Sequence, residues 1–411
     1  MPDSMTEPTS PLSDEARTIV EATAGVVAAH AEQITGRFYP AMFAAHPELL
    51  RVFNQGNQAS GEQRKALAAS VVAFALSLID PDAPPFDPVL ERIAHKHVSL
   101  GIRPEQYTIV GRHLMAAVGE VLGDAVTPEV ARAWDEVYWL FAVRLVAREA
   151  QLYAAAGIDP AHPWRRYRVV QRVEEAHDVI SLMLRPMDRE PVPPHRPGQY
   201  VSVAVDLPDG RRQPRQYTVS TGARRNTLHI TVRRERGTDG RPPGEVSTFL
   251  HEHAWKKSEL DVSAPMGDVF LSDGESPVLL ISAGVGITPI AAMLDDLSLI
   301  SPERQVQFLH ADRSPEHHPL YEATVRAGSE LEAFSSQLWY EELDDAARAR
   351  GALQGLMDLS VVAVPKDAEV FLCGPAGFMT FVRRQLVDAG VDPANIRYEV
   401  FGPDMWAGQP A

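Results

Sequence analysis

The sequence predicts a multidomain protein: an all-α unit, then an antiparallel β-barrel, then an α/β unit with a doubly wound parallel sheet. The chain has 411 residues, which is too long for one ordinary core. Its apolar spacing is helical over residues 14–156 and becomes that of short strands from Trp164. From about residue 273, apolar strands alternate with helices, as in a parallel sheet covered on both faces.

The overall composition excludes several classes of protein. Hydrophobic residues make up 45% and charged residues 23%, which is typical of a soluble globular protein. The sequence has no uninterrupted apolar run of about 18 residues, so we expect no membrane span. A net charge of -16 argues against nucleic-acid binding and gives no support for docking on anionic membranes. The lone Cys373 cannot form an internal disulfide, which fits a reducing cytoplasm.

Changes of composition predict the domain boundaries. Residues 1–13 are acidic and rich in Pro, Ser and Thr, without a basic start and an apolar core, so we expect a disordered lead-in rather than a signal peptide. The helical unit then covers residues 14–156, and the Pro-containing residues 157–163 form a linker. The β unit is expected over 164–272 and the α/β unit over 273–411.

Two histidines stand close together in the predicted helix "PVLERIAHKHVSL". Leu90, Ile93 and His97 share one face, whereas His95 lies about 200° away from His97, with Glu91, toward solvent. The inward histidine is therefore His97. Taken alone, such a residue is more often a hydrogen-bonded core histidine than a ligand. An all-helical unit of this size around it nevertheless suits a haem pocket, where neutral imidazole ligates iron.

The β unit contains the motif "RQYTVS", residues 215–220. Arg215 can pair with a phosphate in bidentate fashion, Tyr217 projects from the same strand face, and Thr218 supplies a hydroxyl. By itself the pattern is weak, since Arg and Tyr are common in exposed strands. "PPGEVSTFLH" places Gly244 and Ser247 at a helix start, where backbone N–H groups can hold a diphosphate.

In the α/β unit, "VLLISAGVGITPI" is a strand, a glycine-rich turn and a helix start. Gly284 and Gly286 give G-x-G, but Pro289 stands in place of the third glycine and suits the first helical turn. Thr288 could add a hydroxyl to a pyrophosphate. "FLCGPAGFM" puts Cys373 at the edge of the sheet where ligands bind. The alternative is a buried thiol in a core strand, and nothing supports a nucleophilic role.

These segments together resemble flavohaemoglobins over nearly the whole chain from about residue 14. The helical unit carries the resemblance in "GRFYPAMF", "VFNQGNQASGEQRKAL", "IAHKHVSLGIRPEQYTIVG" and "VAREAQLY". The other two units carry it in "RQYTVS", "GVGITP" and "YEVFGP", which are similar to motifs of ferredoxin-reductase-like flavoproteins. Thr218 replaces the Ser of many members and keeps the hydroxyl.

The resemblance implies roles for individual residues. His97 would be the proximal haem ligand, with Tyr107 and Glu149 behind it making the imidazole a stronger electron donor. Without the resemblance, Glu149 would be a surface charge. The remaining residues implied at the haem are Tyr39 and Gln63 on the distal side, with Phe53, Leu67 and Lys96 in contact with the cofactor. Taken alone, Tyr39 would be a routine aromatic core residue.

The same resemblance assigns FAD to the β unit and NADH or NADPH to the α/β unit. In the family an aromatic at Phe401 covers the flavin, whereas the sequence alone would make it an unremarkable tail residue. The implied FAD contacts are Tyr200, Arg215, Gln216, Tyr217, Thr218, Gly244 and Ser247. The implied nucleotide-side contacts are Gly284, Val285, Gly286, Ile287, Thr288, Pro289, Cys373, Gly374, Pro375, Glu399, Val400, Phe401, Gly402 and Pro403.

The implied function is nitric oxide dioxygenation, with electrons flowing from NAD(P)H through FAD to haem iron, and with no obligatory protein partner. Two alternatives remain: a haem-based gas sensor, which would not need an electron supply, and a general flavin reductase whose helical unit mediates interactions. Haem absorption together with nitric-oxide-dependent NADH consumption would separate the three. The choice between NADH and NADPH stays open, because "HADRS" offers both Asp312 and Arg313.

Overall fold

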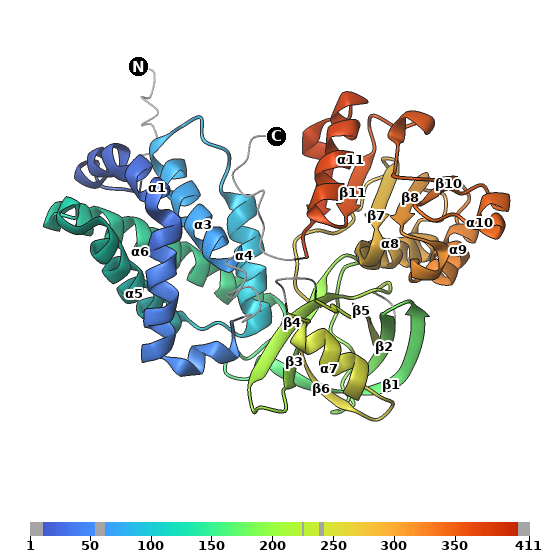
Figure 1. The fold of residues 1–411 in the computed structure, drawn as a ribbon, viewed down its shortest axis with the longest axis horizontal. Helices are drawn as coiled ribbons and strands as arrows, with labels where there is room; N and C mark the ends of the chain where they lie inside the picture. The colour runs from blue at the N-terminus through green and yellow to red at the C-terminus, as the bar shows by residue number, and fades with distance from the viewer. Residues whose placement is uncertain (1–10, 54–61, 224–225, 238–241, 402–411) are drawn as a thin grey trace, which may run out of the picture. The chain divides into compact units, whose positions relative to one another are not determined.

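The computed structural model describes residues 11–53, 62–223, 226–237 and 242–401, apart from the side chains of residues 62–66. The chain divides into two compact units. Residues up to 162 belong to unit 1, and residues 163–402 form unit 2. Figure 1 shows the elements of both units.

Unit 1 is helical throughout its described part. Its helices are α1 (Asp14–Ala45), α3 (Glu62–Ile79), α4 (Asp87–Leu100), α5 (Pro104–Leu122) and α6 (Pro128–Ala155), with short 3-10 turns η1 (Pro47–Arg51) and η2 (Gly123–Ala125). Side chains cap two of the starts: Ser13 accepts a hydrogen bond from the backbone of Ala16, and Thr127 accepts one from Val130. Helices α4, α5 and α6 have Pro in their first turn, where the missing N–H costs no hydrogen bond.

The core of unit 1 lies between α1, which contacts α3, α5 and α6, and α4, which packs on α6. Phe74 of α3 stacks on Phe141 of α6 with ring centroids 4.9 Å apart, and Phe86 at the start of α4 meets both rings edge-on. This aromatic cluster fixes the start of α4, the helix that carries His97.

The first part of unit 2 is an antiparallel barrel. Its strands are β1 (Trp164–Ala176), β2 (Val179–Pro186), β3 (Tyr200–Asp206), β4 (Arg212–Thr218), β5 (Leu228–Arg233) and β6 (Glu259–Ser263). They pair in the order β4-β3-β6-β1-β2-β5, and a bridge between Val219 and Ile230 joins the two ends of the sheet. Helix α7 (Glu245–His253) packs against β4 and β5. Val203, Leu182 and Ile230 are among the fully buried residues that fill the interior.

The second part of unit 2 is a parallel sheet with helices on both faces. Its strands are β7 (Val278–Ala283), β8 (Val306–Asp312), β9 (Phe334–Tyr340), β10 (Leu353–Gln354), β11 (Glu369–Cys373) and β12 (Ile396–Glu399). The helices are α8 (Ile287–Ile300), α9 (Tyr321–Ser329), α10 (Asp345–Ala349) and α11 (Ala376–Asp388), with 3-10 turns η3 (Gly284–Gly286), η4 (Pro315–His317), η5 (Leu359–Val361) and η6 (Pro393–Asn395). The order is β10-β9-β8-β7-β11-β12.

This order produces a switch point between β7 and β11. The chain moves outward from β7 through β8 to β9 on one side, and from β11 to β12 on the other. Right-handed connections therefore place α8 and α9 on one face and α11 on the opposite face (Figure 1). In open α/β sheets, ligands bind at the carboxyl ends of the two strands that flank such a point. Here those ends are the glycine-rich turn after Ala283 and the segment that begins at Cys373.

The fold class predicted from the sequence is confirmed, in the predicted domain order. Helix α6 ends at Ala155 and β1 begins at Trp164, on either side of the predicted linker. The predicted lead-in extends slightly too far, because Leu12 is buried and the Ser13 hydroxyl donates to Glu136 of α6. Residues 1–10 lie outside the described part.

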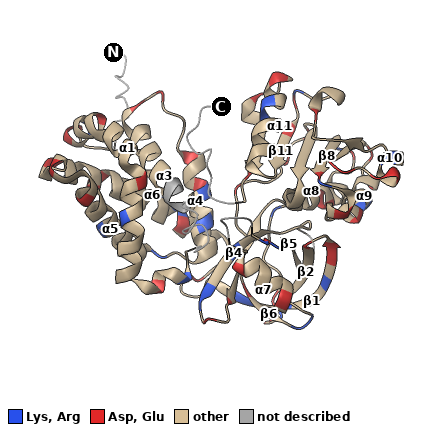
Figure 2. Ribbon diagram, in the orientation of Figure 1, with Lys and Arg blue, Asp and Glu red and all other residues tan. Residues whose placement is uncertain are grey.

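In the α/β part of unit 2, the charged residues lie mainly on the helices and loops around the sheet. In Figure 2 the ribbon of the parallel sheet is almost free of Lys, Arg, Asp and Glu, which sit on the surrounding helices and loops. The central strand β7, "VLLISA", is buried throughout and carries no charge, as expected for a parallel strand covered on both faces. Within the described residues, no helix is long and apolar enough to span a membrane.

Candidate functional site

His97 of α4 is held from behind by two residues of neighbouring helices. Its Nδ1 lies 2.8 Å from Glu149 Oε1 of α6 and 2.8 Å from the hydroxyl of Tyr107 of α5. Tyr107 also donates a short hydrogen bond to the same Glu149 oxygen. Glu149 is only 2% exposed, so the predicted alternative of a surface charge is wrong.

The donors and acceptors of this cluster determine the state of the histidine. Burial and the nearby carboxylate raise the pKa of Tyr107, so its hydroxyl keeps its proton and donates a hydrogen bond to Glu149. A carboxylate can only accept, so the hydrogen bond between Glu149 and His97 requires a proton on Nδ1. In the neutral ring, Nε2 then carries the lone pair, and among the described residues it has no hydrogen-bond partner. A neutral imidazole in this tautomer is a ready metal ligand.

Tyr138 supports the cluster from α6, and the sequence did not reveal it. Its hydroxyl donates to the backbone carbonyl of Tyr107 over 2.5 Å. A Cβ on Gly111 of α5 would lie 2.4 Å from the ring of Tyr138, so this position needs glycine. A glycine inside a helical pattern was the available signal, because it often marks a close approach of another element.

The predicted position of His95 is wrong. Its side chain is not at the solvent edge: the residue is 8% exposed, whereas the side chain of His97 is 29% exposed. Helix α4 buries a stripe through Leu90, Ala94 and Val98, and His95 lies beside that stripe. On the same side, Glu91 forms an ion pair with Arg148 of α6. Because α4 has neighbours on more than one side, helical phase alone did not distinguish inside from outside.

The predicted distal residues form an aromatic group at the end of α1. Tyr39 is buried, and its ring lies 4.6 Å from Phe38, 5.8 Å from Phe43 and 6.0 Å from Phe53, measured between centroids. Leu67 of α3 and Lys96 of α4 are half-buried. The Gln63 side chain lies outside the described residues.

Arg215 on β4 is a half-buried cation without a carboxylate partner among the described residues. Its Nη1 donates to the carbonyl of Pro214 at 2.6 Å and to Gln213 Oε1 at 3.2 Å, and its other N–H groups have no partner in that part of the chain. Burial lowers the pKa of Arg215. A half-buried guanidinium without a carboxylate partner can pair with an anionic ligand, and a diphosphate fits its forked donors.

The neighbouring residues of β4 form an apolar support. Tyr217 packs against the barrel core, and burial raises its pKa, so the phenol stays neutral. Thr218 is buried and pairs with Tyr200 of β3. The Gln216 side chain donates to Ser202 at 3.1 Å, which ties this strand to β3.

Helix α7 begins at the predicted glycine. Gly244 is its N-cap, and a Cβ there would lie 2.6 Å from the hydroxyl of Ser247 and 2.9 Å from Glu235. That hydroxyl donates to the Gly244 carbonyl and accepts from the Glu235 backbone. Ser247 thus shapes the helix start, and the backbone N–H groups of the first turn remain as anion donors.

The glycine-rich turn after β7 meets the end of β11 backbone to backbone. Gly284 has a φ of +54°, in the region that favours glycine. A Cβ on Gly286 would lie 2.5 Å from the carbonyl oxygen of Cys373, so only glycine allows this contact. A Cβ on Gly374 would meet the ring of Phe378 at 2.8 Å. Both predicted loops therefore lie together at the switch point.

Three predicted contacts in this loop have side chains that point into the fold. The hydroxyl of Thr288 donates to the backbone carbonyl of Val285 at 3.1 Å, and the residue is buried, so its proton is used within the turn. The side chains of Ile287 and Pro289 are buried in the sheet–helix layer. This arrangement leaves the backbone of Gly284 and the half-buried Val285 as the accessible part of the turn.

Cys373 is a core residue at the end of β11. It is buried, and burial, with a contribution from the neighbouring Glu399, raises the pKa of its thiol well above the usual value. A protonated thiol is a poor nucleophile, which agrees with the absence of any sequence support for that role. Glu399 pairs with Cys373 across β11 and β12. The exposed Pro375 then begins the approach to α11.

The C-terminal predictions can be located only in part. Val400 is half-buried, and Phe401 is 49% exposed and follows the last strand. Gly402 and Pro403 lie outside the described residues.

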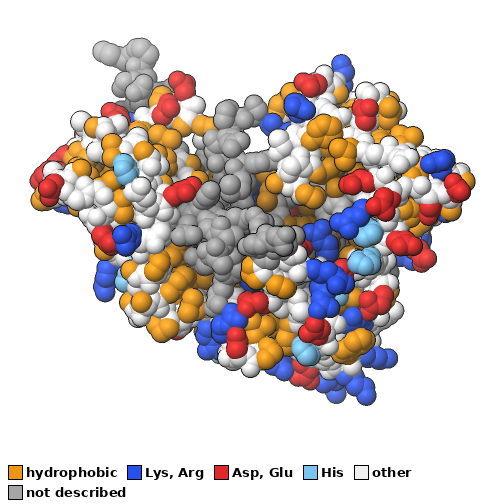
Figure 3. Space-filling view, viewed as in Figure 1, with side chains coloured by type: hydrophobic (Ala, Val, Ile, Leu, Met, Phe, Trp, Pro, Cys, Tyr) orange, Lys and Arg blue, Asp and Glu red, His pale blue; other side chains and the backbone are white. Residues whose placement is uncertain are grey.

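One basic side chain lies beside the glycine-rich turn and others lie at the end of β8, although the chain as a whole is acidic. The Arg233 guanidinium lies 3.7 Å from the point where a Cβ on Gly284 would stand. At the end of β8, Arg313 lies 3.5 Å from His317, whose ring is 5.1 Å from that of His177. Figure 3 shows Lys, Arg and His side chains gathered on one face of unit 2. Such a patch attracts an anionic ligand such as a nucleotide.

Comparison with known proteins agrees with this division of sites. The profile of the globin family matches residues 36–144, and that of the oxidoreductase NAD-binding domain matches residues 280–384. A flavohemoprotein of Bordetella parapertussis is 42% identical over 402 residues, which cover 95% of this chain and 98% of the relative. The chain belongs to the flavohaemoglobin family. A flavohemoprotein of Bacillus subtilis is 36% identical, again over 95% of this chain and 98% of the relative.

Solved structures of this family are similar to both units of the chain. The flavohemoglobin of Malassezia yamatoensis, determined with bound FAD and heme, superposes with a TM-score of 0.86 at 34% identity, covering 95% of this chain and 100% of that one. The flavohem-like FAD/NAD-binding domain of a nitric oxide dioxygenase from Vibrio cholerae is 37% identical, with a TM-score of 0.54. It covers 58% of this chain and 99% of its own.

Proposed function

We propose that this flavohaemoglobin is an NAD(P)H-dependent nitric oxide dioxygenase, which converts nitric oxide and dioxygen to nitrate. The observation that carries the proposal is the hydrogen bond from His97 Nδ1 to the buried Glu149. An anionic partner behind a ligating imidazole favours oxygen activation over simple storage. Family membership supports the same conclusion, as does the 37% identity to a domain of the nitric oxide dioxygenase from Vibrio cholerae.

The residues fit the three cofactors of the proposal. When bound, haem supplies an iron centre for dioxygen, FAD converts hydride transfer into single-electron transfer, and NAD(P)H supplies the hydride. His97 would ligate the iron through Nε2, while Tyr107 and Glu149 hold its tautomer. The hydroxyl of Tyr39 would donate a hydrogen bond to the dioxygen substrate and the Gln63 amide would stand beside it, with Phe53, Leu67 and Lys96 as further haem contacts.

Unit 2 would hold the flavin and the nucleotide. Arg215 and the start of α7 would bind the FAD diphosphate, with Tyr217 against the flavin. The turn at Gly284 and the end of β11 would hold the nicotinamide nucleotide at the switch point. Phe401 would cover the flavin ring and yield to the nicotinamide. The requirement for NAD(P)H and the single, buried cysteine together support a location in the cytoplasm.

The stoichiometry of the reaction provides a strict test. Each nitrate formed from nitric oxide and dioxygen consumes one electron, so one hydride supports two nitrates. Purified protein should show haem and flavin absorption together and should form nitrate in a two-to-one ratio to oxidised NADH. A gas sensor would bind nitric oxide without oxidising NADH. A general flavin reductase would oxidise NADH at a rate that nitric oxide does not change.

The variant His97→Ala tests the separation of the sites. It should lose haem absorption and nitrate formation, while reduction of FAD by NADH continues, since Arg215 and the Gly284 turn belong to the other unit. The surface variant Glu129→Gln serves as the matched control in unit 1. Equal loss of haem binding and flavin reduction in His97→Ala would contradict the proposed division of labour.

A further inference from the structure

The loop after β8 bears on which nicotinamide coenzyme the chain uses. In a βαβ unit that binds a dinucleotide, the end of the second strand meets the adenosine ribose. An acidic side chain there binds the 2′-hydroxyl of NADH, whereas an arginine accommodates the 2′-phosphate of NADPH. Here the unit is β7, α8 and β8, and it ends in Asp312 followed by Arg313. Both kinds of side chain are present, so their orientations decide between the coenzymes.

The carboxylate of Asp312 is turned into the fold. The side chain is only 10% exposed. Its Oδ1 accepts a hydrogen bond from the backbone N–H of Arg313 at 2.8 Å, and its Oδ2 lies 3.4 Å from Nε2 of the fully buried His310. Burial raises the pKa of this carboxyl group. To bind a ribose hydroxyl, Asp312 would have to leave these partners, so it is a poor recognition group for NADH.

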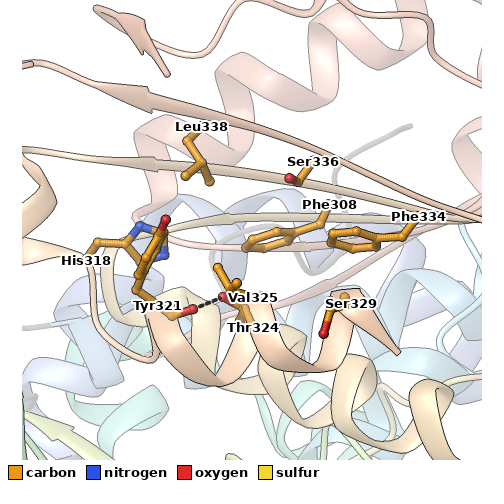
Figure 4. A pocket seen from close by; sticks show the side chains of 10 residues that line it. Phe308, His318, Tyr321, Thr324, Val325, Ser329, Phe334, Ser336 and Leu338 are labelled. Carbon is orange, nitrogen blue, oxygen red and sulfur yellow. Dashed lines mark hydrogen bonds between the residues drawn. The ribbon is translucent and has the colours of Figure 1, made fainter. Parts of the chain in front are cut away.

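Rings fill the inner side of this strand end. His318 stacks on His310 with centroids 4.0 Å apart, and Tyr321 meets His318 edge-on at 5.2 Å. Figure 4 shows His318 and Tyr321 side by side at the start of α9. A ligand therefore meets the loop from its outer side, where the exposed Arg313 lies.

The guanidinium of Arg313 has no carboxylate partner in the described part of the chain. Its Nη1 lies 3.5 Å from His317 Nε2, which is the outer limit of a hydrogen bond. The backbone N–H of Glu342 donates to the Arg313 carbonyl at 2.8 Å, but its carboxylate forms no ion pair with the guanidinium. The forked donors of Arg313 are thus available to an anion, and they match a phosphate.

Two histidines flank this guanidinium. The Ser314 hydroxyl lies 2.7 Å from Nδ1 of His317 and can donate to it, which puts the ring proton on Nε2, the nitrogen nearest Arg313. The ring of His177 lies 5.1 Å from that of His317. His177 comes from the turn between β1 and β2 of the barrel, and its backbone N–H donates to the Glu316 carbonyl at 3.0 Å. A barrel residue is therefore held beside the loop after β8.

We propose that Arg313, His317 and His177 bind the 2′-phosphate of NADPH, so that this chain prefers NADPH to NADH. The inference rests on the proposed NAD(P)H-dependent function and names its coenzyme. The phosphate would accept a bidentate pair of hydrogen bonds from Arg313 and single ones from the two imidazoles. NADH would leave the guanidinium without an anion and would meet Asp312 in its inward orientation.

A different arginine serves the part that both coenzymes share. Arg233 Nη1 lies 3.7 Å from the point where a Cβ on Gly284 would stand, beside the turn proposed for the pyrophosphate. Its Nε and Nη2 donate to Glu235, at 3.0 and 2.7 Å. Removing Arg233 should therefore weaken both coenzymes alike, whereas removing Arg313 should weaken NADPH alone.

The first experiment measures the anaerobic reduction of FAD by NADPH and by NADH in the full-length holoprotein, using stopped flow. The second-order rate constant for NADPH should be larger by about tenfold or more, the effect of a hydrogen bond to a charged group. Equal constants, or a larger one for NADH, would overturn the proposal. Nitric oxide takes no part in this assay. A protein that prefers NADPH but forms no nitrate would contradict the proposed function alone, and nitrate formation with a preference for NADH would contradict only the coenzyme assignment.

Variants then assign the preference to the loop. Arg313→Gln should lower the constant for NADPH by about tenfold or more and leave that for NADH unchanged. Arg326→Gln removes the same charge from the exposed face of α9 and should change neither constant. Arg233→Gln should lower both constants by the same factor. An equal loss for both coenzymes in Arg313→Gln would overturn the role of Arg313, and an unchanged NADPH constant in His177→Asn would remove the barrel histidine from the site.

A binding measurement separates the phosphate from the hydride transfer. The probes are 2′,5′-ADP, which carries the 2′-phosphate without a nicotinamide, and AMP, which lacks that phosphate. Calorimetry on the holoprotein should show 2′,5′-ADP binding about tenfold or more tightly than AMP, and Arg313→Gln should make the two affinities equal. Equal affinities in the natural protein would overturn the proposal. A preference for 2′,5′-ADP that survives Arg313→Gln would place the phosphate elsewhere and overturn it as well.

Discussion

Glu149→Gln tests the cluster behind His97 most directly. The substitution keeps the size and the acceptor oxygen of the side chain, so His97 Nδ1 and Tyr107 can still donate to it. It removes the negative charge, which is buried and lies 2.8 Å from the imidazole nitrogen. The change therefore isolates the electrostatic effect of the carboxylate on the histidine.

The size of the effect follows from this distance. Two unit charges 2.8 Å apart interact by about 6 kcal/mol at an effective dielectric constant of about 20. The N–H of a neutral imidazole is a dipole rather than a full charge, so we take about 2 kcal/mol, the usual value for a hydrogen bond to a charged group. That energy corresponds to about 30-fold in rate, if the whole effect acts on the transition state.

The assay is nitric oxide consumption followed with an electrode, at saturating NADH and dioxygen. Glu149→Gln should turn over about 30-fold more slowly than the natural protein while retaining its haem absorption. Reduction of FAD by NADH should be unchanged, because Arg215 and the Gly284 turn belong to unit 2. Glu129→Gln, at the exposed start of the same helix, is the control and should have no effect.

Full turnover by a Glu149→Gln protein that retains its haem would contradict this expectation. The carboxylate would then have no electronic role. The shape of the side chain, which the substitution preserves, would be sufficient for turnover. Loss of haem would instead show that the charge mainly keeps His97 in position. Tyr107→Phe separates these cases further, since it keeps the carboxylate and removes one of its donors.

Three further predictions concern packing, the nucleotide turn and pH. Gly111→Ala should lower the free energy of unfolding by about 1–3 kcal/mol through overpacking. Gly119→Ala, where a Cβ meets nothing within 4 Å, should instead stabilise α5 by up to about 1 kcal/mol. Thermal unfolding measures both variants. Gly286→Ala should raise the KM for NADH at least tenfold without altering haem absorption, and Gly377→Ala, with open space around it, should leave that KM unchanged. Burial lowers the pKa of His310 to about 3, so the unfolded chain binds more protons between about pH 3 and 6.5 and stability falls on acidification. Between pH 7.5 and 5.5 this histidine should cost about 1.4 kcal/mol in urea unfolding, and a pH-independent midpoint would contradict its burial.

The spacing of apolar residues along the chain predicted the architecture well, because helices, half-buried strands and fully buried strands each have a different spacing. Buried parallel strands are continuous apolar runs, and "VLLISA" was recognisable as β7 for that reason. Gly284 and Gly286 were recognisable because backbone geometry at the turn tolerates little else. The edge elements β10 and β12 were not predicted, since they are short and their pairing depends on the completed sheet.

The candidate site was less accessible to sequence reasoning, because it depends on distant contacts. His95 was placed wrongly, since helical phase describes one helix and not how many neighbours cover it. Tyr138 and the stacked pair His310 and His318 escaped notice, because their roles arise from contacts across elements. The position of Glu149 behind His97 followed only from the resemblance, as the two residues are joined by the packing of α4 on α6.

The contact between Gly286 and the Cys373 carbonyl has a consequence for protein engineering. The two loops come from different parts of the chain, yet the segment at Cys373 leaves no space for a single carbon added to Gly286. Grafting a nucleotide loop from another reductase into residues 284–289 alone would bring a backbone shaped for a different partner. A successful graft should transfer residues 373–375 as well, so that both halves of the interface arrive together. Under the proposed function, coenzyme preference would therefore be better redesigned around Asp312 and Arg313, which we expect beside the ribose, than in the loop itself.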